Sequence, residues 1–183
     1  MKTESTVMYV LRLSGTLLLI AAVVALALAG VNMVTAPIID QLKAEKTQMA
    51  IEAVLPGGGQ EIDFTDSTGL VTKVYASDKG YAVQVAPAGF DNTITMMVGV
   101  DFEGKVLGIS VVKHTETAGL GAVAAAKTSA GEAFRGQFVG ASGSVGTAKR
   151  GTGTMDAITG ATITSEAVCV GVNAALDCVK NLG

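Results

Sequence analysis

The stretch DAITGATITS, residues 156–165, places four side-chain hydroxyls around a Gly-Ala pair, and this spacing is suited to two different roles. A helix is predicted to begin at residue 165, so the residues alone favour Thr164 or Ser165 as its N-cap. A phosphate could also bind there, because free backbone N–H groups and the positive end of the helix dipole meet at a helix N-terminus. A threonine esterified to that phosphate would hold a nucleotide-like cofactor, but so weakly acidic a hydroxyl needs an enzyme or an activated donor to react.

The stretch KHTETAGLG, residues 113–121, follows a predicted strand and leads into a predicted helix. Its glycines allow a positive φ and a close approach of the backbone to a flat ligand. A structural strand-to-helix turn would explain the same glycines. The stretch does not match GxGxxG and lacks an acidic residue at the matching distance, so it gives no support for dinucleotide binding.

Few other residues could act as catalysts or ligands. His114 is the only histidine, which leaves no Ser-His-Asp set and no histidine-based metal site. Cys169 and Cys178 lie on opposite faces of a predicted helix, which excludes a disulfide between them. We therefore expect no catalytic residue and no metal site. The net charge of −3, without a run of Lys or Arg, argues against a nucleic-acid partner.

Residues 13–31 carry no charge, in a chain whose mean hydropathy is +0.49. About 20 apolar residues cross the hydrocarbon core of a bilayer, and this run is longer than the apolar region of a signal peptide. Ala27 and Ala29 form an Ala-x-Ala of the kind at which signal peptides are cleaved, but the length favours an uncleaved anchor.

The orientation of this anchor is predicted from the lengths of its flanks, because the cations on its two sides nearly balance. A short N-terminus and a long following domain favour a cytoplasmic N-terminus and an exported domain. We therefore predict a cytoplasmic segment at 1–12, a transmembrane anchor at 13–34 and an extracytoplasmic domain at 35–183.

The pattern after the anchor predicts an α+β fold, with an antiparallel sheet and flanking helices. An amphipathic helix is expected to begin at Pro37, which suits a first helical turn, and to end before Pro56. Alternating apolar residues predict strands at 70–76, 81–86, 93–102 and 105–112. Helices are expected at 122–138, with Phe134 and Phe138 facing the sheet, and at 165–182, after a Gly/Ser/Thr connector at 140–154.

Two motifs resemble those of a known family. DAITGAT resembles the flavinylation signature of FMN-binding domains, and HTETAGLG resembles the HxETPGLG segment of the G subunit of the Rnf electron-transport complex, with Ala118 in place of the usual Pro. One N-terminal membrane span followed by an FMN-binding domain also fits that subunit. The C subunit of the sodium-pumping NADH:quinone oxidoreductase shares the signature, but it is generally longer and its middle segment is less similar.

The resemblance implies a role for each matching residue. Thr162 would carry FMN covalently through a phosphoester bond. The recognition sequence for a flavin transferase, which uses FAD as the FMN donor with magnesium, would comprise Asp156, Thr159, Gly160 and Ala161. The isoalloxazine ring would be lined by His114, Glu116, Thr117, Gly119 and Leu120.

The resemblance implies a membrane-anchored electron-transfer subunit of an ion-translocating ferredoxin:NAD oxidoreductase complex, with other membrane and peripheral subunits as partners. The chain alone would not be catalytic, because the complex is the enzyme. Three alternatives stay open: the equivalent subunit of the sodium-pumping oxidoreductase, a stand-alone flavin reductase, and an exported non-redox binding module in which the hydroxyl cluster only caps a helix.

Four aromatic residues could stack near the flavin or belong to the core: Tyr75, Tyr81, Phe90 and Phe134.

Overall fold

A computed structural model describes residues 3–148 and 153–182 of the chain. The chain divides into two compact units, Met1–Glu45 and Lys46–Gly183. Part of the predicted connector, residues 149–152, lies outside the described residues. The predicted boundary between anchor and exported domain, at residues 34 and 35, stays a prediction.

The first unit consists of the greater part of α1 (Thr3–Val54), a helix of 52 residues. Its segment from Thr6 onward is long and apolar enough to cross a membrane, and none of its most apolar stretch is buried within the described part of the chain. A helix that is apolar all round requires a partner or lipid around it. These properties fit the predicted anchor.

The prediction of a separate helix that begins at Pro37 is wrong, because Pro37 lies inside α1. Proline lacks the N–H that would bond to the carbonyl four residues earlier, yet the residues on both sides keep the helix intact. Two residues before Pro37, the hydroxyl of Thr35 donates a hydrogen bond to the carbonyl of Val31 at 2.8 Å. The anchor and the amphipathic segment are therefore one continuous helix.

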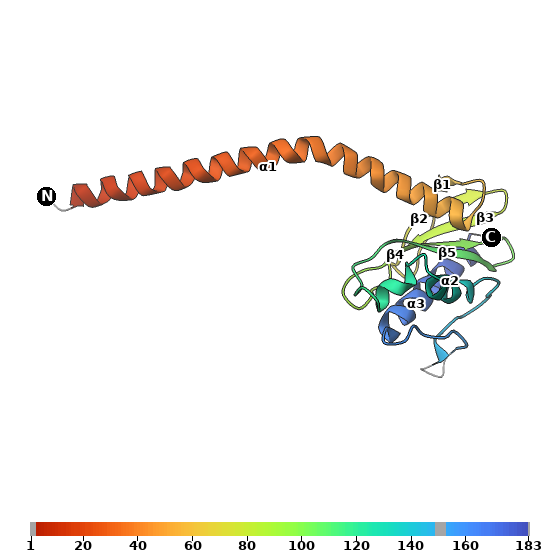
Figure 1. Ribbon diagram of the computed structural model, residues 1–183. Helices are drawn as coiled ribbons and strands as arrows, with labels where there is room; N and C mark the ends of the chain where they lie inside the picture. Colours follow the sequence, from red (N-terminus) through yellow and green to blue (C-terminus); the bar gives the residue numbers. More distant parts are fainter. Residues whose placement is uncertain (1–2, 149–152, 183) are drawn as a thin grey trace. The chain divides into compact units, whose positions relative to one another are not determined.

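The second unit is built on an antiparallel sheet of five strands in the order β1-β2-β3-β4-β5 (Figure 1). The four predicted strands are confirmed, and β1 is an additional short strand that pairs with β2. The strands are β1 (Gln60–Ile62), β2 (Val71–Ser77), β3 (Gly80–Val85), β4 (Thr95–Val100) and β5 (Val106–Lys113).

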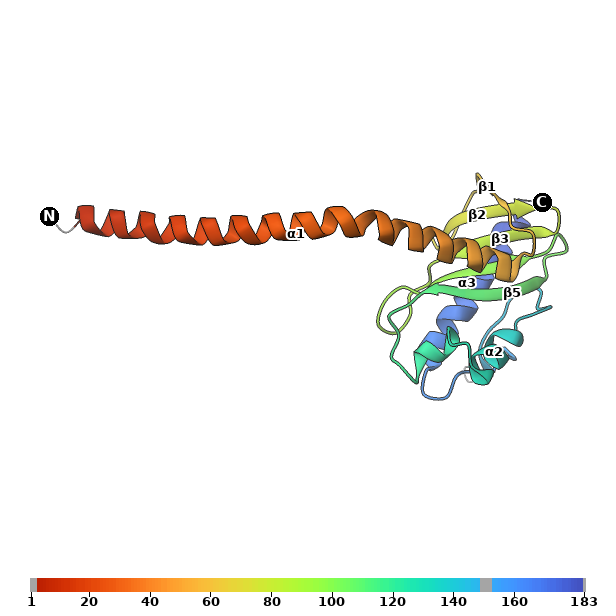
Figure 2. The ribbon, with the colours of Figure 1, turned by 45° about the horizontal axis from the view of Figure 1, so that its top comes forward.

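One face of the sheet is covered by α3 (Thr162–Lys180), which crosses behind the strands in Figure 2. Val168, Val172 and Val179 of this helix are buried in one apolar cluster with Val74 and Val83 of the sheet. The predicted α+β fold is thus confirmed. The helix begins at Thr162, three residues earlier than predicted, so Thr162, Thr164 and Ser165 lie within its first turn.

The other face of the sheet packs against the end of α1. Ile51 and Val54 form a second buried cluster with Tyr75 and Met97. The helix backbone can approach this face only because position 99 is glycine, since a Cβ there would overlap the carbonyl oxygen of Val54. The sheet is therefore buried on both faces.

The predicted helix at 122–138 is in fact two short helices, η1 (Gly121–Ala124) and α2 (Ser129–Gly136). Thr128 starts α2 as its N-cap, because its hydroxyl accepts a hydrogen bond from the N–H of Gly131 at 3.3 Å. Between the two helices, the Arg135 guanidinium donates to the carbonyls of Ala124 and Ala126 at 2.7 and 3.0 Å. Phe134 and Phe138 are buried in the cluster against the sheet, as predicted.

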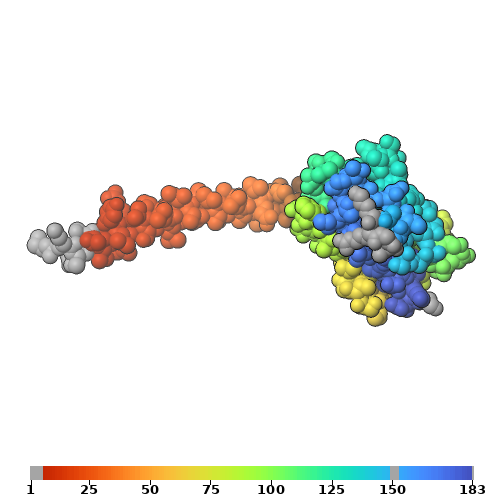
Figure 3. Space-filling model, turned by 90° about the horizontal axis from the view of Figure 1, so that it is seen from below, coloured from red at the N-terminus to blue at the C-terminus, as the bar shows by residue number. Residues whose placement is uncertain are grey.

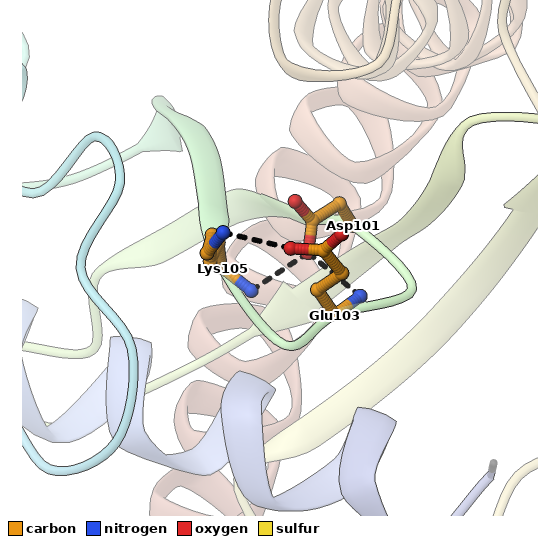
Figure 4. Close-up of polar contacts among 3 residues, drawn as sticks. All are labelled: Asp101, Glu103 and Lys105. Carbon is orange, nitrogen blue, oxygen red and sulfur yellow. Dashed lines mark hydrogen bonds and ion pairs between the residues drawn. The ribbon is translucent and has the colours of Figure 1, made fainter.

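The turn between β4 and β5 is held by the carboxylate of Asp101 (Figure 4). Its Oδ1 accepts hydrogen bonds from the N–H groups of Glu103 and Lys105 at 2.9 and 2.8 Å. Lys105 also forms an ion pair with Glu103 at 2.7 Å, but both of these side chains are more than half exposed. The backbone bonds to Asp101 therefore hold the turn, and the exposed ion pair adds little.

We expect Asp101→Ala to lower the free energy of unfolding by about 1–2 kcal/mol, because two N–H groups lose their acceptor. Glu103→Ala is the matched control and should change it by less than about 0.5 kcal/mol. Urea unfolding of the full-length protein in detergent, followed by circular dichroism, measures both. Equal effects of the two variants would contradict this account.

The loop before β2 is organised by a second carboxylate. Asp66 accepts hydrogen bonds from the N–H of Thr68 at 2.8 Å, from the Thr68 hydroxyl at 2.7 Å and from the N–H of Val71 at 2.9 Å. Partial burial on its own raises the pKa of Asp66, but these hydrogen bonds outweigh it and lower the pKa below the ordinary value of 3.8. The ionised carboxylate therefore stabilises the folded state.

A carboxyl group whose pKa is lowered by folding adds stability above its unfolded pKa, and this stability is lost as the pH falls through the folded pKa. We expect Asp66→Asn to lower the free energy of unfolding by about 1 kcal/mol at neutral pH, with a smaller loss below pH 3.8. Asp63→Asn, at an exposed position of the same loop, is the control. Thermal unfolding of the three proteins over this pH range measures the difference, and a loss for Asp66→Asn that does not vary with pH would refute it.

Candidate functional site

A cavity of about 320 Å³ lies between the segment that follows β5 and the first turn of α3. Figure 3 shows these two segments, coloured green to teal and blue, side by side on one face of the second unit. The cavity is lined by Phe90, Glu116, Thr117, Leu120, Gly121, Gly160, Ala161, Thr162, Ile163 and Thr164. The two motifs singled out in the sequence therefore meet at one place.

Among the described residues, no side chain caps the first turn of α3 at this cavity. Its N-cap residue is Ala161, which offers no side-chain acceptor, and the first helical bond runs from the N–H of Ser165 to the carbonyl of Ala161 at 3.0 Å. The N–H groups of the first helical residues, 162–164, consequently have no acceptor within the helix. Thr162, the first residue of the helix, lines the cavity beside these N–H groups.

The prediction that Thr164 or Ser165 caps this helix is wrong, because both residues are buried inside its first turn. The Ser165 hydroxyl donates to the carbonyl of Ala161 at 2.9 Å and accepts from the N–H of Ile158 at 2.9 Å. Gly160 has a φ of 78°, a conformation that other residues rarely adopt. The turn that presents Thr162 is thus fixed from inside the protein.

The carboxylate of Glu116 joins three segments of the chain at the cavity. It accepts hydrogen bonds from the N–H of Phe90 at 2.9 Å, from the N–H of Asp91 at 3.4 Å and from the hydroxyl of Thr164. The residue is only 7% exposed, so these bonds replace water around its carboxylate. Glu116 lines the cavity, and its carboxylate oxygens are engaged by the chain itself.

The start of the DAITGAT motif is attached to α2 by the side-chain amide of Gln137. The amide nitrogen donates to the carbonyl of Asp156 at 3.0 Å, and the amide oxygen accepts from the N–H of Asp156 at 2.7 Å. Gln137 therefore pairs with the backbone as a neighbouring strand would. The side chain of Asp156 stays exposed at the surface.

The predicted site residues fall into three groups. Six of them line the cavity at Thr162, namely Glu116, Thr117, Leu120, Gly160, Ala161 and Thr162. Gly119, Asp156 and Thr159 line a neighbouring depression of about 520 Å³ instead. His114 lies along neither, and among the described residues its Nδ1 is buried without a hydrogen-bond partner.

Four residues that line the cavity were not among the predicted site residues: Phe90, Gly121, Ile163 and Thr164. The sequence indicates Phe90 only as one of four aromatic residues that could stack near the flavin or belong to the core, and Gly121 only as part of the second motif. Ile163 and Thr164 could have been found had the helix been started at Thr162, since a first turn carries its neighbours to the same place. Phe90 is separated from both motifs by β4 and β5, and no local pattern connects it to them.

The cysteines take no part in this site. Burial raises the pKa of Cys169 to about 11, with a further contribution from the charge of Glu166, so its thiol is protonated at neutral pH. Cys178 is also buried, and neither forms a disulfide. The described residues contain no cluster of His, Cys, Asp and Glu side chains that could hold a metal ion. The chemistry available at the cavity is anion binding at a helix N-terminus beside an apolar surface.

Comparison with known proteins agrees with this geometry. A family model described as an FMN-binding domain matches residues 89–177, a range that includes both sides of the cavity. The G subunit of the Na⁺-translocating ferredoxin:NAD⁺ oxidoreductase complex of Acetobacterium woodii is 32% identical, over 94% of this chain and 93% of that protein. The chain belongs to the family of Rnf G subunits.

Other members of the family are similar to this chain over different extents. The G subunit of the ion-translocating oxidoreductase complex of Methanosarcina acetivorans is 31% identical, over 90% of this chain and 92% of that protein. The G subunit of the proton-translocating ferredoxin:NAD⁺ oxidoreductase complex of Clostridium ljungdahlii is 40% identical, over 56% of this chain and 57% of that protein. As an Rnf G subunit, the chain has an FMN-binding domain and belongs with the other subunits of a membrane complex.

We expect Thr164→Val to lower the free energy of unfolding by about 1–3 kcal/mol, because it leaves a buried oxygen of Glu116 without its hydroxyl donor. If Thr164 only capped the helix, the expected loss of unfolding free energy would be smaller. Thr115→Val, at an exposed position next to Glu116, is the control and should stay within about 0.5 kcal/mol. Urea unfolding that gave both variants the stability of the parent protein would refute the role of the Thr164 hydroxyl.

Proposed function

We propose that this Rnf G subunit is an electron-transfer subunit of an ion-translocating ferredoxin:NAD oxidoreductase complex, and that it carries FMN through a phosphoester bond to Thr162. The observation that carries the proposal is the position of Thr162, which is the first residue of an uncapped helix and lines an apolar cavity. The match to an FMN-binding domain supplies the identity of the cofactor.

The residues at the cavity fit the two ends of FMN. A phosphate on Thr162 would lie beside N–H groups that have no acceptor within the helix, at the positive end of the α3 dipole. Phe90, Leu120 and Ile163 offer an apolar surface for a flat ring. Bound FMN supplies the redox chemistry, and the protein supplies attachment, orientation and environment.

We propose that a second protein attaches the FMN, because a threonine hydroxyl is too weakly acidic to react without an enzyme or an activated donor. We propose a flavin transferase that uses FAD as the donor with magnesium. The Oγ1 of Thr162 forms a bond to the phosphorus of the FMN half, the bond between the two phosphates of FAD breaks, AMP leaves, and the hydroxyl loses its proton. The exposed Asp156 and Thr159, with Gly160 and Ala161, are the residues that this transferase would recognise.

The remaining candidate residues of the second motif would act around the ring. Thr117 and Leu120 line the cavity directly, and Gly119 shapes the turn between them. Glu116 would act by holding the surrounding segments together, because its carboxylate is already bonded within the protein. His114 does not line the cavity, so any effect of its side chain on the ring would be indirect.

We further propose that α1 crosses the membrane once, with a cytoplasmic N-terminus and an extracytoplasmic FMN domain. The length and the exposed apolar surface of α1 support one crossing. The second apolar helix, α3, is largely buried in the domain core and so is not proposed as a span. A covalent bond would keep FMN on the protein at the extracytoplasmic side, where unbound flavin would diffuse away.

We expect Thr162→Ala to abolish covalent flavin, and Thr162→Ser to keep it, because only serine retains a hydroxyl at the start of α3. The full-length variants are produced with an active flavin transferase, separated on a denaturing gel and examined for flavin fluorescence. Circular dichroism controls for folding. Fluorescence retained in Thr162→Ala would contradict the attachment site, and a dark parent band beside a fluorescent control substrate would contradict covalent FMN altogether.

A further inference from the structure

One aromatic side chain at the cavity is exposed in a way that the fold does not explain. Phe90 is 67% exposed and lines the cavity beside Thr162. The other aromatic candidates lie elsewhere: Tyr75 and Phe134 are buried in the two cores, and Tyr81 packs edge-to-face on Phe102 at 5.5 Å. Phe90 alone of the four could contact a ligand in this cavity.

The loop that presents Phe90 is held in place at its base and at its tip. At the base, the N–H of Ile94 donates to the carbonyl of Pro87 at 2.9 Å. Near the tip, the N–H of Gly89 donates to the carbonyl of Asn92 at 2.8 Å. These two hydrogen bonds make the segment a compact hairpin loop, so the exposure of Phe90 does not result from a loose chain.

The same loop is attached to the motif residues by Glu116. The carboxylate of Glu116 accepts the N–H of Phe90 at 2.9 Å and also the hydroxyl of Thr164, in the first turn of α3. One buried side chain therefore sets the position of Phe90 relative to the helix turn that carries Thr162. Because Phe90 is exposed and its loop is fixed, its ring is available to contact a ligand in the cavity.

The apolar surface at the cavity suits a flat aromatic ligand. Leu120 and Ile163 are 44% and 49% exposed, and they line the cavity together with Phe90. Covering these side chains removes apolar surface from water, and a ring stacked on Phe90 gains a further aromatic contact.

We propose that the ring of Phe90 packs against the isoalloxazine of the FMN carried by Thr162, and that Glu116 is the positioning residue that holds Phe90 there. This inference rests on the proposed function, since it takes the FMN on Thr162 as given. It assigns the ring contact to a residue outside both sequence motifs.

The absence of tryptophan from the chain makes a direct test possible. A tryptophan in contact with isoalloxazine quenches flavin emission by electron transfer, which acts only at short range. We therefore expect flavinylated Phe90→Trp to lose most of its flavin fluorescence and to show a shortened excited-state lifetime. Phe102→Trp is the matched control, because Phe102 is also exposed (62%) and lies in a different turn. This control should keep the emission of the parent protein.

The measurement uses full-length protein in detergent, with emission divided by the amount of covalent FMN in each sample. Quenching in Phe90→Trp with normal emission in Phe102→Trp supports the proposal. Equal emission from the two variants overturns it, while the proposed function stands as long as flavin is attached. If the parent protein contains no covalent flavin, the proposed function itself fails.

A second measurement tests the contact without tryptophan. Phe90→Ala should increase the quenching of covalent flavin by iodide, because one face of the ring loses its cover, and Phe102→Ala should not. Adding Glu116→Gln to Phe90→Trp should restore part of the emission, since the loop loses its charged acceptor. Unchanged iodide quenching in Phe90→Ala would overturn the ring contact, and unchanged emission on adding Glu116→Gln would overturn the positioning role.

Discussion

The arrangement of the site depends on one buried carboxylate. Glu116 is almost removed from water, so its charge requires donors from the protein, and it finds them in the Phe90 loop and in the first turn of α3. These segments are far apart in the sequence, and the carboxylate is bonded to both of them. The hydrogen bonds to Glu116 therefore fix the shape of the cavity, and the positions of Thr162 and Phe90 follow from it.

The second constraint is the dual role of α3. Its apolar side fills the core of the domain against β2 and β3, while its first turn is left without a side-chain cap at the surface. A rigid, buried helix gives the N–H groups of residues 162–164 a fixed direction, which is what anion binding at a helix N-terminus requires. Ser165 strengthens this arrangement by bonding to the backbone on both sides of the turn. A cofactor attached to Thr162 would therefore bind at a helix terminus whose position the protein already fixes.

The sequence predicted the elements whose patterns are local. Alternating residues marked four of the strands, and an uncharged apolar run marked the anchor. The errors occurred where a long-range contact decides the structure. Thr164 and Ser165 are good caps by type, but Glu116 and the preceding turn engage their hydroxyls and allow α3 to begin at Thr162.

The helix predicted at 122–138 divides because Thr128 caps a new helix and Arg135 bonds to carbonyls between the two. Phe90 could be named only as one of four aromatic residues that either stack on the flavin or belong to the core, because only the pairing of β3, β4 and β5 brings its loop to Glu116.

The central claim is that Thr162 carries the cofactor, and the most direct test is mass spectrometry of the chain isolated from its own membranes. Trypsin should release residues 151–180 as one peptide, which contains Thr159, Thr162, Thr164 and Ser165. Fragmentation of this peptide locates any FMN phosphodiester on a single side chain. One FMN is expected on Thr162, and none on the other five hydroxyl side chains of the peptide, which include Thr152 and Thr154. FMN on Thr159, or a peptide without flavin in a complex that is active in electron transfer, would contradict this claim.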